Sequence, residues 1–440
     1  MRETTAARYA GTRVQRVEDG RLLTGHGTFV DDVRRPGMLH TCFVRSPFAH
    51  ARVTHVDISA ALDLPGVHAV FLAADLNPDI REQWYTSMGK DIPDTPRPAL
   101  ASDEVRFVGD PVALVIAESR YIAEDATELV EVDYDPLPAV ADYRDAETAD
   151  ALVHEAYPGN VAGRMGGPPP AAAEEVFAAA AHVADETIYQ QGYAAVPIET
   201  RGLVVEWSAG ELTIWAATQA PHEVRAFCAR LLGLPEQCVR VIMRDTGGGF
   251  GQKVIPLRED MCVMLAARKV PAAIKWIEDR RENLMSAGQA DMPYVNPCGM
   301  PYDHMSPRET FDLALEMLDY GAFRREQHEA RAAGRYLGVG TCSYVEPTST
   351  GMGYYATEGA TIRIEPSGAV NVYVAGGSTG NSIETTVVQL TADALGVDLD
   401  QVATIQGDTA VTPFGAGTAG SRSGSRSRCC ATSSARTSAR

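Results

Sequence analysis

The segment GGGFGQK at 247–253 carries the clearest chemical signal in this 440-residue chain. Residues without a Cβ let the backbone approach a ligand closely and take conformations that other residues avoid. Free backbone N–H groups in such a loop, and at the start of the helix expected after it, favour a phosphate or an oxo group. The alternative interpretation is a tight glycine turn that only connects a strand to a helix.

The elements that position this loop can be predicted from the apolar pattern. Apolar residues recur at i, i+3, i+4, i+7 and i+8 from Val224, which predicts a helix that Gly233 can end. A short strand is expected over 239–243, and it delivers the glycines to its tip. A second helix is expected over 257–269, with basic residues in its last turn.

The letters around the loop exclude two nucleotide-binding motifs. A phosphate-binding P-loop requires GxxxxGK followed by Ser or Thr, but Lys253 is followed by Val254. A dinucleotide fingerprint requires GxGxxG. Gly247 and Gly249 fit that pattern, whereas Gln252 occupies the third glycine position. The loop therefore belongs to neither class.

The wider pattern resembles a known family. TQAPH at 218–222 followed by GGGFGQK at 247–253 is similar to the molybdenum cofactor-binding large subunit of the xanthine dehydrogenase and aldehyde oxidase family. Within that family, the resemblance is greatest to the aerobic carbon monoxide dehydrogenase large-chain branch. Further ordered motifs carry the same resemblance: GHGTFVDDV at 25–33, RSPFAHARV at 45–53, VRFVGDPVALVIAESR at 105–120, VDYDPLPAV at 132–140 and IKWIEDRRENL at 274–284.

The resemblance implies roles for residues near the first glycine loop. Gln219 matches a family glutamine whose amide donates to an oxo ligand of molybdenum. Gly249, Phe250 and Gly251 match the loop whose backbone abuts the metal, and Gly248 belongs to the same cofactor-binding loop. The Phe250 ring is expected to form part of the substrate passage, so Gln219 and Phe250 are the candidate catalytic residues. Without the motif, Phe250 would be read as a core aromatic and Gln219 as a strand-end amide that satisfies backbone groups.

A second glycine-bearing stretch late in the chain has the same order of strand, turn and helix. The pattern predicts a strand over 370–374, a turn over 376–380 and a helix that ends at Gly396. The family has a pterin-contacting GTGQG motif here, which makes Gly380 and Asn381 candidate cofactor contacts, although Asn381 is one methylene shorter than glutamine. A purely structural turn is the alternative. The segment 407–423 also follows the family and adds three candidate cofactor residues: Thr418, Ala419 and Ser421.

The family implies a cofactor and partner chains. A molybdenum–pterin, expected to be of the molybdopterin cytosine dinucleotide type, carries the metal, and oxygen from water is inserted at a carbon centre of a small-molecule substrate. Two electrons then leave through a flavin-containing medium subunit and a 2Fe-2S small subunit. The metal and pterin supply the hard chemistry, while the protein orients them. Carbon monoxide, an aldehyde and a nitrogen heterocycle all stay open as substrates.

Composition narrows the other classes. The chain is 45% hydrophobic and 22% charged, which suits two or three domains. Its net charge of -19 argues against nucleic acid, because such a partner needs Lys and Arg to neutralise its phosphates. Residues 1–20 lack the apolar core of a secretory signal, and no run approaches the ~20 apolar residues of a membrane span. A cytoplasmic protein without a membrane span is therefore expected.

The cysteines and histidines do not form a metal-binding pattern. The eight cysteines include no CxxC pair, so neither an iron–sulfur cluster nor a structural zinc site is expected, and no flavin is assigned to this chain. Cys228 and Cys262 fall on apolar helix faces and are expected to be buried small hydrophobes. His222 lies next to the candidate site but is expected to form a structural hydrogen bond. No side chain is predicted to ligate the metal.

The predicted fold class is α+β, a mixed α/β chain with an N-terminal hammerhead α/β domain followed by an incomplete molybdenum cofactor-binding α/β region. Strands are expected over 112–117, 131–134, 196–207 and 211–219, and a helix over 121–130. The expected division is a hammerhead domain (1–145), a linker and connecting segment (146–185), a first cofactor-binding part (186–290), a partial second part (291–423) and an aberrant disordered tail (424–440).

The chain departs from the family pattern in two places. After 280–284 the family continues through a long segment that shapes the substrate pocket, whereas Gln289 and Ala290 here run into a stretch that resembles a much later family segment. An internal piece is therefore expected to be missing. Residues 421–440 contain five arginines and no acidic residue, a composition that cannot support a core. A basic disordered tail and a reading-frame shift are the two explanations, and the frame shift is favoured.

These departures leave two hypotheses of different classes. The glutamate that the family uses as general base has no counterpart here, and Glu259 and Asp260 are expected only to serve the first turn of a helix, where the dipole favours acidic residues. The first hypothesis is a molybdenum hydroxylase large (catalytic) subunit, an oxidoreductase chain that is incomplete. The second is a non-catalytic remnant that folds but lacks enough of the cage to hold the cofactor.

Overall fold

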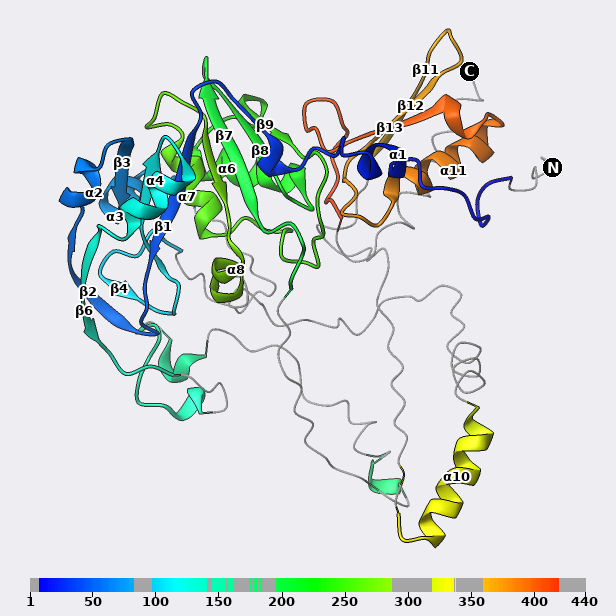
Figure 1. Cartoon of the computed structure of the whole chain (residues 1–440), viewed down its shortest axis with the longest axis horizontal. Coiled ribbons are helices and arrows are strands. Elements are labelled where there is room, and N and C mark those ends of the chain that lie inside the picture. The colour runs from blue at the N-terminus through cyan, green and yellow to red at the C-terminus, as the bar shows by residue number, and fades with distance from the viewer. Residues whose placement is uncertain are drawn as a thin grey trace.

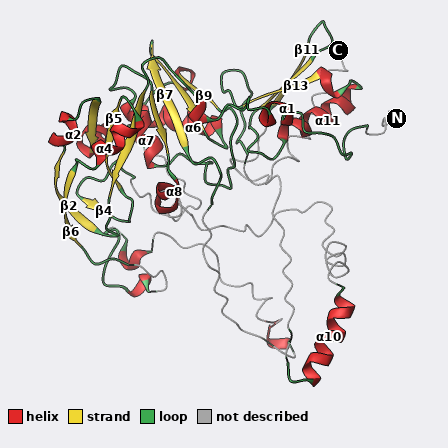
Figure 2. Cartoon of the chain, in the orientation of Figure 1, coloured by secondary structure: helices red, strands yellow, loops and turns green. Residues whose placement is uncertain are grey.

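The computed structural model describes most of the chain in separate stretches. Within them, helices and strands are mixed along the sequence (Figures 1 and 2), which confirms the expected α+β class. The described residues are 8–82, 97–140, 145–155, 157–161, 175, 177–180, 183, 195–286, 319–335, 337 and 359–418.

The N-terminal part builds one end of a large sheet. Strand β5 (Pro111–Ala117) is buried at every residue because β1 (Leu39–Arg45) and β3 (Val67–Leu72) pair with its two edges and α4 (Arg120–Thr127) packs on it. Ser119 caps α4 by accepting a hydrogen bond from Ile122 N. The other elements of this part are a small sheet in the order β4 (Glu104–Val105), β2 (Ala51–Asp57) and β6 (Glu131–Pro136), and the helices α1 (Asp19–Leu23), α2 (Ser59–Asp63) and α3 (Ala73–Leu76).

A parallel pairing joins this part to the next. Strand β1 pairs with β10 (Ile274–Ile277), which gives one seven-stranded sheet in the order β3-β5-β1-β10-β7-β8-β9. Helices α6 (Pro221–Leu232) and α7 (Arg258–Ala266) contribute apolar side chains to the core against this sheet. The remaining elements are β7 (Gly202–Ser208), β8 (Glu211–Ala216), β9 (Val239–Ile242) and α8 (Arg280–Ser286).

A third group of elements has its own core. Strands β11 (Ala360–Ile364), β12 (Val370–Val374) and β13 (Val402–Gln406) form a sheet that packs with α11 (Ile383–Leu395). In Figure 1 the N-terminal segment, drawn in blue, runs from this group to the large sheet. The remaining helices are α10 (Tyr320–Ala332) and the short 3-10 turns Val30–Asp32, Asn77–Asp79, Ala146–Thr148, Pro158–Asn160, Glu236–Cys238 and Leu399–Gln401.

The elements around both glycine stretches confirm the sequence predictions, mostly with shorter bounds. Helix α6 ends at Gly233, whose left-handed φ of 63° a residue with a side chain would rarely adopt. The late strand, turn and helix also occur, and α11 ends at Gly396 in the same conformation. Other elements are shifted by a few residues: α7 ends at Ala266, β8 at Ala216 and α4 at Thr127, while β6 extends to Pro136.

The strand expected over 196–207 is wrong in its first half. Strand β7 begins at Gly202, and the residues before it pass beside the first glycine loop. The backbone and side chain of Glu199 bond to the first glycine loop, and Arg201 pairs with Glu278 and Glu259, so polar contacts to other segments replace strand pairing in this stretch. The tail predicted at 424–440 lies outside the described residues, as does 162–174 in the middle of the predicted linker.

A buried ionic network stabilises the base of this region. Glu259 accepts hydrogen bonds from Arg45 Nη1 (2.8 Å) and Arg201 Nη1 (3.2 Å), and Glu278 accepts one from Arg201 Nη2 (2.6 Å). Arg45 Nε also donates to Glu282 (2.9 Å). Burial would by itself raise the pKa of Glu259, but Arg201 and Arg45 outweigh it and lower the pKa to about 2. The network therefore joins β1, β7, α7 and α8 through paired charges.

Removing one partner of this network is expected to destabilise the fold. Glu259→Gln removes the negative charge that faces the buried guanidinium groups of Arg45 and Arg201. This change is expected to lower the unfolding free energy by about 3–5 kcal/mol. Glu124→Gln, which breaks the exposed pair with Arg120, is the matched control and is expected to cost under about 1 kcal/mol. Urea unfolding of both variants measures the difference. Equal losses would contradict the structural role of the buried network.

Candidate functional site

The first glycine loop leaves β9 and exposes its backbone. Gly248 and Gly251 have positive φ values of 98° and 86°, and Phe250 has a φ of 53°, which is uncommon for a bulky residue. Phe250 is 75% exposed, so its interpretation as a core aromatic is wrong. Within the described residues, the amides of Gly248, Gly249 and Phe250 find no hydrogen-bond acceptor. The loop thus presents peptide edge and an aromatic ring outward.

Gln219 lies directly against this loop. Its Oε1 atom accepts hydrogen bonds from the backbone N–H groups of Gly251 (3.1 Å) and Lys253 (3.3 Å). The backbone N–H of Gln219 donates to Lys253 O (2.8 Å). A Cβ atom on Gly249 would lie 2.4 Å from Gln219 Cδ. Because real Cβ atoms do not approach so closely, glycine is required at 249 by contact rather than by backbone angle. The structure therefore brings Gln219, Gly249 and Gly251 together.

Thr418 closes the same contact from the late part of the chain. Gln219 Nε2 donates to Thr418 O (2.8 Å), and Thr418 N donates to Gln219 O (2.7 Å). The Thr418 hydroxyl donates to Gly377 O (2.6 Å) in the second glycine turn. Gln219, which lies between β8 and α6, therefore satisfies backbone groups of the loop and of Thr418. One of the two N–H groups on its Nε2 atom is nevertheless left over for a ligand.

In the second glycine turn, a side chain forms hydrogen bonds within the turn itself. Asn381 Oδ1 accepts hydrogen bonds from Thr379 N (3.1 Å) and Ser378 Oγ (3.3 Å), so this amide oxygen stabilises the turn itself. Gly380 has a φ of 95°, and a Cβ there would meet nothing within 4 Å. These contacts favour the structural interpretation of Asn381 over a pterin contact. Ala419 and Ser421 lie outside the described residues.

Comparisons with known proteins identify the family of the chain. The profile of the aldehyde oxidase and xanthine dehydrogenase a/b hammerhead domain matches residues 24–138, and two molybdopterin cofactor-binding domain profiles match residues 153–296 and 313–437. The crystal structure of quinoline 2-oxidoreductase from Pseudomonas putida 86 superposes with a TM-score of 0.84 at 30% identity, covering 97% of this chain and 70% of that one. The chain belongs to the xanthine dehydrogenase and aldehyde oxidase family.

This family member is similar in sequence to the large subunits of characterised enzymes. The nicotine 6-hydroxylase large subunit of Paenarthrobacter nicotinovorans is 32% identical over 94% of this chain and 65% of the relative. The carbon monoxide dehydrogenase large chain of Hydrogenophaga pseudoflava is 28% identical over 92% of this chain and 67% of the relative. The chain thus spans about two thirds of the length of these relatives. The hammerhead fold followed by molybdopterin-binding domains, predicted from the sequence, is confirmed.

One residue that binds the first glycine loop was not predicted from the sequence. Glu199 Oε2 accepts hydrogen bonds from Gly247 N (2.8 Å) and from Lys253 Nζ (3.0 Å), so it ties both ends of the glycine loop. The Lys253 side chain is fully buried, and burial lowers its pKa despite the Glu199 carboxylate. The available signal was a glutamate inside the apolar run VPIETRGLVV, which the strand interpretation absorbed.

A second missed residue supports the loop from α8. Asn283 Nδ2 donates to Gln252 Oε1 (3.0 Å) and to Glu278 Oε2 (2.9 Å), which links the loop to the buried ionic network. Asn283 is itself 1% exposed. The motif IEDRREN, quoted for its family resemblance, therefore has a local physical role beside the site.

The acidic pair at the start of α7 splits into two roles. Asp260 Oδ2 accepts a hydrogen bond from Leu257 N (2.8 Å), so its expected service to the first helical turn is confirmed. Glu259 also lies in the first turn of α7, but its side chain has further partners. It points into the buried ionic network, because two arginines from other elements converge on it.

His222 is a structural residue, as expected. Its Nε2 atom lies 3.2 Å from the Thr412 hydroxyl, and its ring packs edge-on against Phe414. Burial lowers the pKa of His222 to about 4, and nearby Arg225 adds to the effect. Within the described residues there is no group of three or more His, Cys, Asp or Glu side chains that could hold a metal ion. The same residues include no helix that is long and apolar enough to cross a membrane.

The contact between Gln219 and Gly249 can be tested by a double-mutant cycle. Gly249→Ala is expected to displace the loop and cost about 1–3 kcal/mol of unfolding free energy through overpacking. In a Gln219→Ala background the same change should cost little more, because the side-chain atoms that it meets are gone. Chemical denaturation of the three variants gives the coupling. Additive losses would show that the two residues do not touch.

A matched glycine controls for the general effect of adding a methyl group. Gly20 lies in α1 with nothing within 4 Å of a built Cβ and without a positive φ. Gly20→Ala is therefore expected to be neutral or slightly stabilising, since alanine is the better helix former by about 1 kcal/mol.

The raised pKa of Asp260 leads us to expect a specific pH dependence of the unfolding free energy. Burial raises its pKa to about 6, although Arg201 opposes the effect. Because the folded pKa lies above the usual value near 4, the stability that the protonated group contributes at low pH is lost as pH rises through about 6. Asp260→Asn keeps an acceptor oxygen for Leu257 N and removes the titration. The decline in unfolding free energy between pH 4 and 6.5 should shrink by up to about 2–3 kcal/mol.

Thermal or urea unfolding across this pH range measures the effect. Glu128→Gln, at the exposed C-cap of α4, is the control for removing one surface carboxylate. Parallel profiles for Asp260→Asn and the unaltered chain would rule out the assigned pKa.

Proposed function

We propose that this chain is the molybdenum–pterin-binding large subunit of a hydroxylase that oxidises a small substrate with water-derived oxygen. The observation that supports this most is the contact of Gln219 with the bare peptide of Gly249 and Gly251, closed by Thr418. It places an amide donor, unprotected backbone and an exposed ring at one point. These are the features that the family resemblance assigned to the surroundings of the metal.

The residues at this point fit such a group. Three loop amides have no acceptor among the described residues, and Gln219 Nε2 retains one N–H for a ligand oxygen. The left-handed backbone of Phe250 costs free energy in a bulky residue, and such strain persists where surrounding structure maintains it, often at ligand sites. Here Gln219 and Glu199 maintain it by holding the loop on both sides.

Each residue then has a defined task in the proposed reaction. When bound, the molybdenum–pterin would supply the two-electron oxidation of the substrate carbon. Gln219 would orient the group through its amide, and the peptide of Gly248, Gly249 and Gly251 would let it approach the backbone. Phe250 would line the substrate passage and limit the access of water. Gly380, Asn381, Thr418, Ala419 and Ser421 are the further cofactor contacts that the family resemblance proposes.

The relatives bear on the substrate and partners. Their names point to nicotine, quinoline and carbon monoxide, so a nitrogen heterocycle has the most support, with an aldehyde or carbon monoxide as the other members of the class. One relative is a subunit of a dehydrogenase complex. We therefore propose a flavin-containing medium subunit and a 2Fe-2S small subunit as electron-accepting partners, and a cytosine dinucleotide form of the cofactor.

A second candidate function rests on a specific observation. The alignment with the nicotine 6-hydroxylase runs over 537 positions, at least 97 more than the 440 residues of this chain, which supports an absent internal segment. In addition, Asn381 turns its amide oxygen into its own turn. Both points favour a remnant that folds and binds a partner subunit but does not retain the cofactor.

Metal analysis of the purified full chain separates the two. Expression with molybdate should give molybdenum near one atom per chain and pterin fluorescence after oxidation. A well-folded, metal-free chain that still binds a partner would support the remnant instead.

A variant tests whether the metal sits where we propose. Gln219→Ala is expected to lower retained molybdenum by 10- to 100-fold, the usual loss when a residue beside a metal is removed. Gln237→Ala, at an exposed glutamine, is the control and should retain it fully. Equal metal content in both variants would exclude Gln219 from the site.

A further inference from the structure

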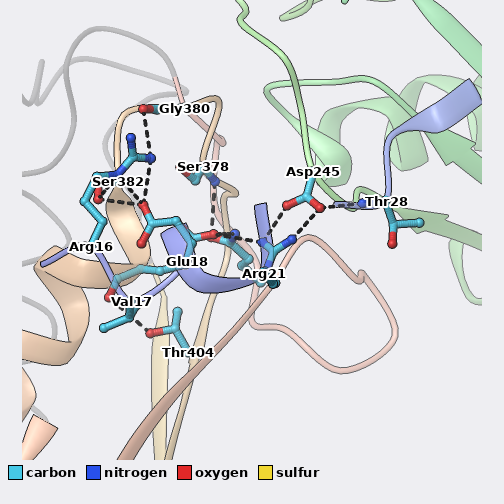
Figure 3. A network of polar contacts seen from close by, with 12 residues as sticks. Arg16, Val17, Glu18, Arg21, Thr28, Asp245, Ser378, Gly380, Ser382 and Thr404 are labelled. Carbon is cyan, nitrogen blue, oxygen red and sulfur yellow. Dashed lines mark hydrogen bonds and ion pairs between the residues drawn. The ribbon is translucent and has the colours of Figure 1, made fainter. Parts of the chain in front are cut away.

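The N-terminal segment 8–28, hereafter the N-terminal strap, lies between the second glycine turn and the residues that lead into the first loop (Figure 3). We propose that the strap positions the two glycine turns relative to one another, with the buried carboxylate of Glu18 as its central contact. This inference rests on the proposed function, which assigns both turns to the cofactor. Its physical basis is a set of contacts between residues more than 200 positions apart.

Glu18 holds the end of the second turn. It is 4% exposed, and its Oε1 accepts hydrogen bonds from Ser382 Oγ (2.6 Å) and Arg16 Nη2 (2.9 Å), while its Oε2 accepts one from Thr385 Oγ1 (2.8 Å). Burial opposes ionisation, but these donors lower the pKa of Glu18 below its usual value. Val17 N also donates to Thr385 Oγ1 (2.9 Å).

Ser382 shows why this contact matters for the turn. It precedes α11 at the position where a serine hydroxyl commonly accepts a hydrogen bond from the helix amides, yet its side chain forms no such cap. The hydroxyl donates to Glu18 instead, and the residue has a φ of 60°, which is costly for a non-glycine residue. The conformation of the turn at Ser382 therefore depends on a strap residue and not on α11 alone.

The other end of the strap holds the approach to the first loop. Arg21 binds Asp245 through both terminal nitrogens, each at 2.5 Å, and Thr28 N donates to Asp245 Oδ2 (2.7 Å). Asp245 N returns a hydrogen bond to Thr28 O (3.0 Å). Asp245 stands two positions before Gly247, so the strap fixes the backbone where the glycine loop begins. Glu18 directly precedes α1, and Arg21 lies within α1, so one short helix carries the contacts to both turns.

The second turn is held from its other side by different residues. Thr418 donates to Gly377 O, and a Cβ on Gly377 would lie 2.5 Å from Met243 Sδ at the end of β9. Ser378 N donates to Gln406 Oε1 (3.1 Å). Thr418 and the strap thus both contact the second turn. Thr418 also bonds Gln219, which holds the first loop, and the strap bonds Asp245 just before that loop. A ligand that needs both turns would require this spacing to be maintained.

Hydrogen–deuterium exchange of the full chain without added cofactor tests the proposal. Glu18→Ala should speed the exchange of amides in 376–386 at least tenfold and also speed exchange in 245–251. Arg8→Ala removes an exposed strap contact with Asp398, beyond the C-terminal end of α11, and it should change neither segment more than twofold. Unchanged exchange in Glu18→Ala, or an equal effect of Arg8→Ala, would overturn the proposal.

A second variant guards against simple misfolding of the first. Asp245→Asn weakens the opposite end of the strap, and it should speed exchange in 376–386 as well as locally. A purely local effect of Asp245→Asn would overturn the proposal, because it would show that the strap transmits no constraint.

Molybdenum content then separates this proposal from the proposed function. Glu18→Ala should retain at least fivefold less metal than Arg8→Ala. If no form of the chain binds molybdenum, the proposed function fails while the exchange result still decides the role of the strap. Equal metal retention in the two variants would show that the strap does not position the cofactor turns.

Discussion

The amide of Gln219 is the interaction on which the site depends. Its oxygen holds the loop amides at Gly251 and Lys253, its nitrogen holds Thr418, and its side-chain atoms fill the space that a Cβ on Gly249 would need. One side chain, from the segment between β8 and α6, thus joins the first glycine loop and the late part of the chain. Because every contact is directional or steric, a shift of the amide would release all three together.

Charge supplies the rigidity behind this contact. Glu199 pairs with the fully buried Lys253, and Arg201 pairs with Glu278 and Glu259 on the neighbouring elements. Charges removed from water are costly unless each has a partner, so the loop cannot move without leaving one of them uncompensated. The N-terminal strap adds a constraint of the same kind through Glu18. A strained, exposed loop is therefore carried on a base of paired charges.

The sequence predicted the parts that depend on local pattern and family motif. Helix α6 with its end at Gly233, and the convergence expected of Gln219 with the loop, follow from spacing and resemblance. The role of Glu199 could not be predicted, because its partners are about fifty positions away and an apolar surrounding reads as strand. Phe250 was open to interpretation as a core residue for a different reason, because an aromatic residue considered alone favours burial. Asn381 shows the reverse case, a motif position whose amide serves its own turn.

Anomalous diffraction at the molybdenum absorption edge, from crystals of the molybdate-grown full chain, tests the central claim most directly. The account predicts a single anomalous peak beside the backbone of Gly249 and Gly251, within hydrogen-bonding reach of a ligand held by Gln219. A peak elsewhere in the molecule, or a Gln219 side chain turned away from the loop around the metal, would contradict it.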